Sequence, residues 1–198
     1  MNKRRLFLSL TLLLSLTVVS CDLFHTREPE PPTKGGSSYL PPTSPQRVLQ
    51  NLTNAVKERN TDSYVRCLAD SLTSPRTFRF IPTEQSAAQY YGVFSGWSLR
   101  NERQYFDNLK SHMSPSAVPG LTLSRETFEY ISGDSAIYDA GYVLFIPHDV
   151  TGVPQTIRGN LHFTMGLDRN NMWMIYQWID LSSGSEYSWS DLKGRFSY

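Results

Sequence analysis

Cysteine and histidine are the residues of this 198-residue chain whose side chains most readily bind metals or attack substrates. The two cysteines, Cys21 and Cys67, are too few for a cysteine-based zinc site. The four histidines lack the spacing of metal ligands: His25, His112, His148 and His162. Cys67 falls in a predicted helix, with its nearest basic side chain, Arg66, on another face. We therefore expect no metal, no cofactor and no cysteine nucleophile, and we interpret Cys67 as a buried apolar side chain.

The first twenty residues have the three parts of a secretory signal peptide. Three basic residues at 3–5 precede an uncharged apolar stretch over 6–19, and the small residue Ser20 precedes Cys21. The apolar stretch is shorter than the roughly 20 residues that cross a bilayer as a helix. The segment resembles a bacterial lipoprotein signal, which implies that Cys21 becomes the first mature residue and carries lipid. The alternative is an ordinary secreted protein with a cysteine near its cleavage site.

Lipid on Cys21 would hold the protein on the extracytoplasmic side of a bacterial cell-envelope membrane. Two or more acyl chains anchor a protein stably, whereas a single chain anchors it only marginally. The chain has a net charge of +1, and loss of the three basic residues of the signal leaves the mature protein at −2. This charge gives no reason to expect nucleic acid or an anionic membrane surface as a partner.

Residues 21–43 form a predicted flexible tether. The stretch from residue 22 to residue 45 contains six prolines and two glycines and has little periodic apolar content. Such a composition cannot bury enough surface to offset the entropy of ordering it. The sequence thus predicts a signal peptide over residues 1–20, a lipidated tether over residues 21–43, and a single domain with a C-terminal tail over residues 44–198.

The first half of the domain predicts three helices. Ser44 and Pro45 are typical of a helix start. The apolar residues that follow repeat on one helical face: Val48, Leu49, Leu52, Ala55 and Val56. A second, short helix begins at Thr61 and ends near Leu68, and a third covers residues 98–113. Residues 83–97 show no pattern that assigns them.

From Leu121 onward, apolar and polar residues alternate as in β-strands. Predicted strands cover residues 121–132, 135–147, 155–168 and 172–180. A tight turn at residues 133–134 joins the first pair, and residues 169–171 form a hairpin loop between the last two. A further strand is predicted earlier, at residues 76–82. Helices first and a long-stranded antiparallel sheet later are the pattern of the α+β class.

This order of elements resembles the nuclear transport factor 2-like superfamily, which includes the SnoaL-like polyketide cyclases and the ketosteroid isomerases. The strongest local matches are the opening helix running into "ERNTDSYVRCLAD" and, on the last strand, Trp173, Ile175, Trp178 and Asp180. The resemblance covers residues 44–180. It implies a cone-shaped, curved antiparallel sheet packed on three helices of the N-terminal half, with a pocket at the open end. The tail "SWSDLKGRF" resembles an appendage of bacterial lipoprotein members.

The isomerase members of this superfamily use a carboxylate base, with a tyrosine and a protonated acid as oxyanion donors. Such chemistry needs a carboxylate that faces an apolar cavity and hydroxyl donors across from it. The pocket candidates are Tyr130, Tyr138, Asp139, His162 and Asp180, with Tyr90 and Tyr91 as further tyrosines. The isomerase residues do not map onto these positions one by one, so we assign no catalytic residue.

Each candidate also has a structural interpretation. The tyrosines are core residues with hydroxyl groups at the rim. His162 lies on the polar side of its strand and is solvated or pairs with a cross-strand neighbour. Asp180 ends a strand and caps the turn at residues 181–182.

Three functions stay open. The first, which we favour, is a non-enzymatic, membrane-anchored module that binds a small apolar ligand or a protein. It would dimerise through an exposed sheet face carrying Arg158, Asn160 and Thr164. The second is a small-molecule isomerase or cyclase, marked by a carboxyl group of raised pKa in an apolar pocket. The third is a structural subunit of an envelope complex, marked by a sealed cone with an apolar patch on the tail.

Overall fold

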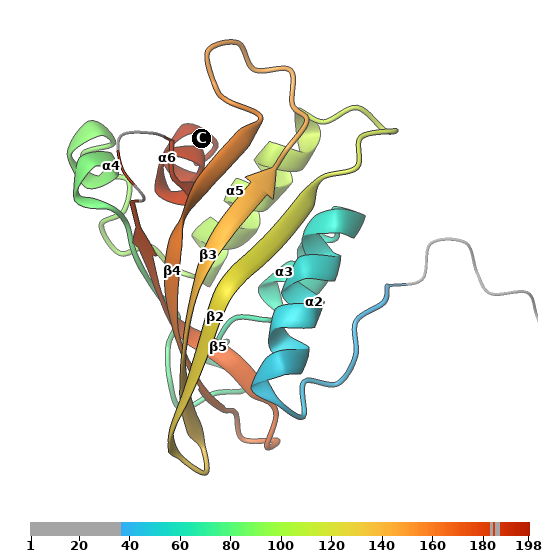
Figure 1. Ribbon diagram of the computed structural model, residues 1–198, viewed down its shortest axis with the longest axis vertical. Helices are drawn as coiled ribbons and strands as arrows, with labels where there is room; N and C mark the ends of the chain where they lie inside the picture. Colours follow the sequence, from blue (N-terminus) through green and yellow to red (C-terminus); the bar gives the residue numbers. More distant parts are fainter. Residues whose placement is uncertain (1–36, 183, 185–186) are drawn as a thin grey trace, which may run out of the picture. The chain divides into compact units, whose positions relative to one another are not determined.

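Helices precede a long-stranded sheet in the computed structural model, which describes residues 37–182, 184 and 187–198 (Figure 1). The helices of the first half are α2 (Pro45–Glu58), α3 (Thr61–Val65), α4 (Glu84–Gln89) and α5 (Leu99–Ser111). The strands are β1 (Arg79–Ile81), β2 (Gly120–Ser132), β3 (Ser135–Phe145), β4 (Thr156–Leu167) and β5 (Trp173–Leu181), and helix α6 (Trp189–Arg195) follows them. The predicted α+β class is confirmed. The predicted signal peptide and Cys21 lie outside the described residues.

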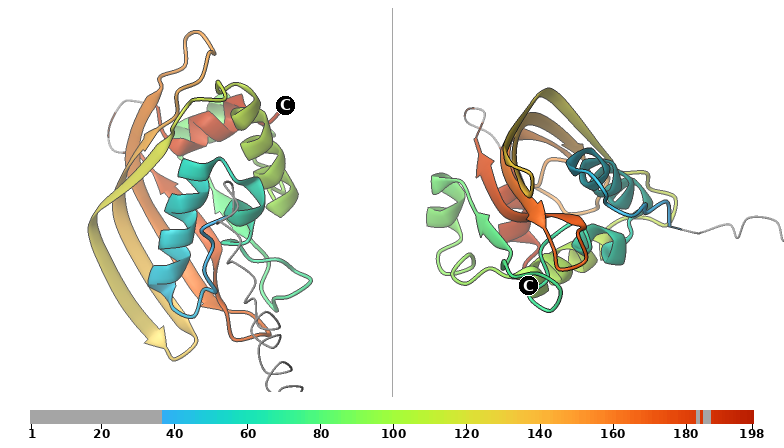
Figure 2. Two further views of the ribbon diagram at one scale, coloured as in Figure 1. Left: turned by 90° about the vertical axis from the view of Figure 1, so that its right-hand side faces the viewer. Right: turned by 90° about the horizontal axis from the view of Figure 1, so that it is seen from below.

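The five strands form one curved sheet in the order β1-β5-β4-β3-β2. Strands β2 to β5 pair antiparallel with their sequence neighbours, as predicted. Strand β1 is shorter than predicted and pairs parallel with β5, where Phe80 lies opposite Trp178. Figure 2 shows the sheet bending around α2 and α5, which lie in its hollow. A cone with the helices on its concave side follows from this bend.

The opening helix α2 has the ends and the buried face that the sequence predicts. The Ser44 side chain accepts a hydrogen bond from the Arg47 N–H, and Arg59 ends the helix in the left-handed region at φ 53°. Apolar residues on one face pack against the sheet and are buried: Val48, Leu49, Leu52, Ala55 and Val56. This amphipathic helix supplies one wall of the core.

Residues 37–43 belong to the folded domain, so the predicted boundary of the tether at residue 43 is wrong. The buried Asn51 side chain accepts a hydrogen bond from the Leu40 N–H at 2.9 Å and donates one to the Leu40 carbonyl at 2.7 Å. The Pro42 carbonyl accepts a hydrogen bond from the Trp173 N–H at 2.8 Å. These backbone contacts pin the segment to α2 and β5, which its composition alone does not reveal. The compact unit accordingly begins at Ser37.

Two helices were not anticipated from the sequence pattern. Residues 83–97 contain α4, which Thr83 caps by accepting a hydrogen bond from the Ser86 N–H. The tail that resembles an appendage contains α6, and its apolar side chains Trp189, Leu192 and Phe196 are buried. Within the described residues, no helix is long and apolar enough to cross a membrane.

Candidate functional site

The interior of the cone contains an ion pair between Glu102 of α5 and Lys193 of α6. Lys193 Nζ donates a hydrogen bond to Glu102 Oε1, and both side chains are completely buried. Trp97 Nε1 donates to the same oxygen at 2.8 Å, and the Tyr64 hydroxyl donates to Glu102 Oε2 at 2.8 Å. Both carboxylate oxygens therefore have donors within the protein, as a buried charge requires.

Aromatic rings surround the ammonium group of Lys193. Its Nζ lies 3.6 Å from the ring centroid of Phe80 and 3.7 Å from that of Trp178, with Trp97 and Tyr105 at 5.9 Å. Cations are attracted to aromatic faces at such distances. Burial lowers the pKa of Lys193 to about 8, although the neighbouring charge of Glu102 opposes this shift. The lysine thus fills the space between the sheet and α5 with a paired charge.

Asp180, a predicted pocket candidate, connects β5 to the start of α6. Its Oδ2 accepts hydrogen bonds from the N–H and the hydroxyl of Ser190, both at 2.6 Å. Its Oδ1 accepts a hydrogen bond from the Tyr142 hydroxyl at 2.9 Å, and that hydroxyl accepts one from the Trp189 N–H at 2.7 Å. Asp180 therefore holds the N-terminus of α6, and the interpretation that it caps the turn at residues 181–182 is wrong.

Further hydrogen bonds fasten α6 to the region before α5. Ser188 and Asp191 form a reciprocal capping box at the start of α6. The Ser86 hydroxyl donates to Asp191 Oδ1 at 2.7 Å, and the Thr83 N–H donates to Ser190 Oγ at 3.0 Å. Helices α4 and α6 thus close one end of the cone together.

This arrangement leaves the interior carboxylates without access to a substrate. Glu102 has no exposed surface and Asp180 only 1%, so neither lines a cavity large enough for a substrate. A general base must lie within hydrogen-bonding reach of the proton that it removes. Burial does raise the pKa of Asp180 above its usual range, against the opposing effect of the bonds from Ser190 and Tyr142. The raised carboxyl pKa that the isomerase alternative requires is therefore present, but it belongs to Asp180, which is buried in the protein interior.

The other predicted pocket candidates lie apart from Asp180, and of these only Asp139 and His162 contact each other. Asp139 and His162 pair across strands on the outer face of the sheet, with His162 Nδ1 2.8 Å from Asp139 Oδ1. The ring of Tyr138 is buried on the opposite face, and its hydroxyl donates to Glu126 Oε2 at 2.7 Å. Tyr130 is exposed and accepts a hydrogen bond from Gln46 Nε2 at 3.0 Å. The structure does not assemble these residues into one site.

Tyr90 and Tyr91 have separate positions as well. Tyr91 is 94% exposed. The ring of Tyr90 lies against α6, so close that a Cβ atom at position 194 would be 2.4 Å from Tyr90 Cδ2. Gly194 is therefore needed for the contact between this ring and the tail helix.

The two other histidines of the described residues are His112, the C-cap of α5, and His148, in the loop after β3, whereas His25 lies outside the described residues. His112 Nδ1 is 3.0 Å from Asp149 Oδ1, and His148 Nδ1 accepts a hydrogen bond from the Val150 N–H at 3.2 Å. Both imidazole rings lie within 5.6 Å of the ring of Phe196. In the part of the chain that the structure describes, no three side chains of metal-binding type gather.

Sequence reasoning missed Glu102, Lys193 and Ser190. Trp189, Leu192 and Phe196 occur at positions i, i+3 and i+7, and this spacing is a signal that the tail forms a helix with a buried face. Nothing in the sequence marks Lys193 as buried, because lysine is almost always exposed.

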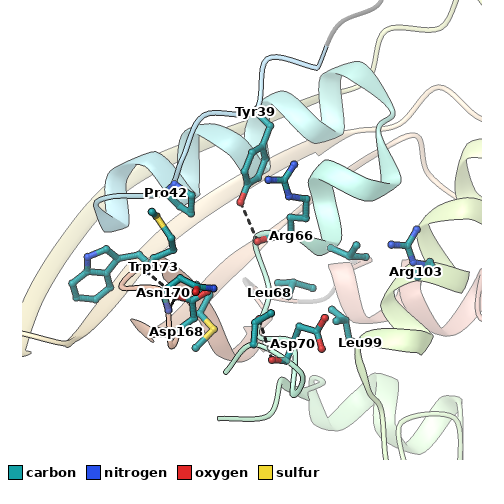
Figure 3. Close-up of a pocket in the computed structure, with 14 residues that line it drawn as sticks. Tyr39, Pro42, Arg66, Leu68, Asp70, Leu99, Arg103, Asp168, Asn170 and Trp173 are labelled. Atoms are coloured by element: carbon teal, nitrogen blue, oxygen red, sulfur yellow. Dashed lines mark hydrogen bonds between the residues drawn. The ribbon is translucent and has the colours of Figure 1, made fainter. Parts of the chain in front are cut away.

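A surface pocket of about 410 Å³ lies outside this interior network (Figure 3). Four chain segments line it: residues 39–42 before α2, residues 65–73 at and after α3, residues 99–103 of α5, and residues 168–174 of the β4–β5 hairpin. The first of these segments was predicted to be tether. The pocket is thus built from parts of the chain that are distant in sequence.

Charged side chains of this pocket are held in position by the surrounding chain. The Arg66 guanidinium lies over the Tyr39 ring at 3.9 Å from its centroid, and the Tyr39 hydroxyl donates to the Arg66 carbonyl at 3.2 Å. Asp70 Oδ1 accepts a hydrogen bond from the Leu72 N–H, and Asp168 Oδ1 accepts two from the hairpin backbone. Burial raises the pKa of Tyr39 to about 12, so its hydroxyl stays protonated.

Comparison with known proteins identifies the fold. A proposed aromatic ring hydroxylase of Novosphingobium aromaticivorans superposes with a TM-score of 0.53 at 15% identity, covering 75% of this chain and 92% of its own. A proposed scytalone dehydratase of the same species superposes with a TM-score of 0.52 at 7% identity, covering 72% and 92%. An NTF2-like protein of Cytophaga hutchinsonii gives a TM-score of 0.48 at 10% identity, covering 69% and 93%.

No protein-family model matches the sequence, and neither does any curated protein. At these identities the two matches with TM-scores above 0.5 establish a shared fold and do not transfer an activity.

Proposed function

Starting from the nuclear transport factor 2-like fold of the domain, we propose that this protein is a membrane-anchored bacterial lipoprotein whose cone-shaped domain is a non-enzymatic binding module. The fold alone does not decide this, since it also occurs in proteins named as proposed enzymes. The decision rests on the interior of the cone and on the surface pocket of Figure 3.

The observation that carries the proposal is that the carboxylate groups of Asp180 and Glu102 are hydrogen-bonded within the protein at both oxygens. Each carboxylate has both oxygens engaged by donors of the protein itself, from Ser190 and Tyr142 in one case and from Lys193, Trp97 and Tyr64 in the other. An isomerase needs a carboxylate free to accept a substrate proton. The hydrogen-bonded carboxylates instead favour a structural role for the interior, so we assign ligand binding to the surface pocket.

The apolar tail required by a structural subunit is not at the surface. Trp189, Leu192 and Phe196 are turned into the core, and Tyr198 is the large apolar residue of the described tail that is exposed. This distribution favours a self-contained domain over a subunit that docks through its tail.

The lipid anchor is tested by replacing its cysteine. We expect Cys21→Ser to move the full-length protein from the membrane fraction to the soluble fraction, because serine offers no thiol for attachment of lipid. The matched control is Cys67→Ala, whose buried thiol donates a hydrogen bond to the Ser63 carbonyl and which should stay in the membrane fraction. Recovery of processed Cys21→Ser protein in membranes would refute the anchor.

We also propose a homodimer formed through the outer face of the sheet. Arg158 is exposed and Asn160 is partly exposed there, and Phe145 of β3 exposes 41% of its surface on the same face. Thr164 is largely buried and lies opposite Gln177, to which it donates a hydrogen bond. Sedimentation equilibrium of wild type and Arg158→Glu should give a dimer and a monomer, respectively; a monomeric wild type excludes the dimer.

A further inference from the structure

We propose that the surface pocket of Figure 3 binds a short peptide of two or three residues with a free amino terminus and a free carboxyl terminus. The inference rests on the proposed binding function and names the class of ligand. It follows from three features of the pocket. One is a cation without an acidic partner among the described residues. The others are two carboxylates, each hydrogen-bonded through one oxygen only, and an apolar surface between these charges.

The cation is Arg66. Its guanidinium is stacked on Tyr39 and has no acidic partner or hydrogen bond among the described residues. By contrast, Arg103 on the far side of the pocket already pairs with Asp62 at 2.6 Å. A guanidinium presents parallel N–H donors that match a carboxylate, and stacking fixes its plane in advance. Arg66 is thus suited to receive the carboxyl terminus of a peptide.

The two carboxylates are Asp70 and Asp168. Backbone amides of the surrounding loops occupy Oδ1 of each side chain, while Oδ2 has no hydrogen-bond partner in the described part of the chain. Figure 3 shows Asp70 on the side of the pocket opposite Tyr39, and Asp168 on the β4–β5 hairpin next to Asn170 and Trp173. Carboxylates anchored through one oxygen are preorganised to accept an ammonium group with the other. These two walls are suited to the amino terminus.

The size and the lining of the pocket favour a peptide over a single amino acid. In a free amino acid the two charged groups sit on one carbon, whereas the pocket carries opposite charges on separate walls. The apolar lining, with Leu68, Met172 and Trp173, can cover side chains between the two termini. A volume of about 410 Å³ lies within the usual range of small-ligand sites, roughly 300–1,000 Å³.

The test uses leucyl-leucine as the probe, titrated calorimetrically into the full-length chain in an uncharged detergent. We expect saturable binding that weakens at least tenfold for N-acetyl-leucyl-leucine and at least tenfold for leucyl-leucinamide, because each analogue loses one charge-assisted contact. Arg66→Met should abolish the preference for the free carboxylate only. The double variant Asp70→Asn/Asp168→Asn should abolish the preference for the free amine only. Arg47→Met, an exposed change on α2, should leave all affinities unchanged.

The selective loss of one preference separates recognition from damage to the fold, since misfolding would weaken every probe alike. Equal affinity for either blocked analogue in the wild type, or no binding up to 5 mM (about −3 kcal/mol), overturns the proposed ligand class. Hydrolysis of the dipeptide by pure protein would overturn the non-enzymatic function instead and leave the ligand class standing.

Discussion

At the scale of single residues, the main finding is that a buried ion pair joins α5 to α6 inside the cone. Lys193 and Glu102 are completely buried and satisfy each other, with Trp97, Tyr64 and the rings of the core completing their surroundings. Burying such a pair is costly, and removing one partner is costlier because it strands the other charge. The pair therefore holds the fold together, and its contribution to the free energy of unfolding should depend on pH.

The ion pair predicts how stability changes in alkaline solution. The pKa of Lys193 is about 8 in the folded protein and about 10.5 when exposed. Between these values the unfolded chain binds more protons, so the contribution of Lys193 to stability increases as pH rises. We expect the free energy of unfolding of wild type, relative to the uncharged variant Lys193→Met/Glu102→Gln, to increase from pH 8 to pH 10.5.

Denaturant unfolding of both proteins at each pH measures this difference, from which the contribution of Cys67 cancels because neither substitution alters the groups that shift its pKa. The control compares wild type with Lys57→Met, an exposed substitution on α2, over the same pH range. A difference for the Lys193 comparison that changes no more with pH than that of the control would contradict a depressed lysine pKa.

At the scale of elements, α6 is a closing helix of the core. Trp189 packs perpendicular to Trp178 at 4.6 Å between ring centroids, and its Nε1 donates to the Tyr105 hydroxyl at 3.0 Å. A helix of seven residues is too short to persist alone in water, so α6 depends on this packing. In return, the packing covers the end of the cone that would otherwise open to solvent.

Truncation of the tail tryptophan tests this role. We expect Trp189→Ala to lower the free energy of unfolding by about 3–5 kcal/mol, the usual cost of deleting a large buried aromatic side chain. Tyr198→Ala, which changes a side chain that is 87% exposed, should stay within about 0.5 kcal/mol of wild type. Equal stability of Trp189→Ala and wild type would show that α6 is an appendage after all.

The elements that the sequence predicts correctly are those with a strong local period. Helix α2 has a cap and an apolar stripe, and strands β2 to β5 alternate over nine or more residues each. The errors have non-local causes. Residues 37–43 are ordered by Asn51 and Trp173, and β1 is recruited as a parallel partner of β5. Neither contact leaves a trace in the neighbouring sequence.

The candidate site was less predictable than the fold. The sequence predicts Asp180 as a pocket candidate, but its role depends on Ser190 and Tyr142 reaching it from other elements. The surface pocket escaped prediction because its walls come from four separate segments, one of them assigned to the tether. Such a site is defined only by the tertiary structure.

At the scale of the whole molecule, side chains fill the interior of the cone, and the pocket that could admit a ligand lies on its outer surface. Side chains of α5 and α6 occupy the interior with an ion pair and aromatic rings, while the first folded residues and the β4–β5 hairpin shape a pocket on the outside. In the proposed function, lipid on Cys21 keeps this pocket at a membrane of the cell envelope. The central claim is that ligands bind at the outer pocket and not inside the cone.

Native mass spectrometry of the full-length chain with excess leucyl-leucine tests that claim most directly. Three proteins are compared: wild type, Arg66→Met and Asp180→Asn. The account predicts the same occupancy by one dipeptide on wild type and on Asp180→Asn, and a lower occupancy on Arg66→Met, which loses the contact to the carboxyl terminus. An occupancy that is unchanged on Arg66→Met and lost on Asp180→Asn would locate the ligand inside the cone and contradict the account.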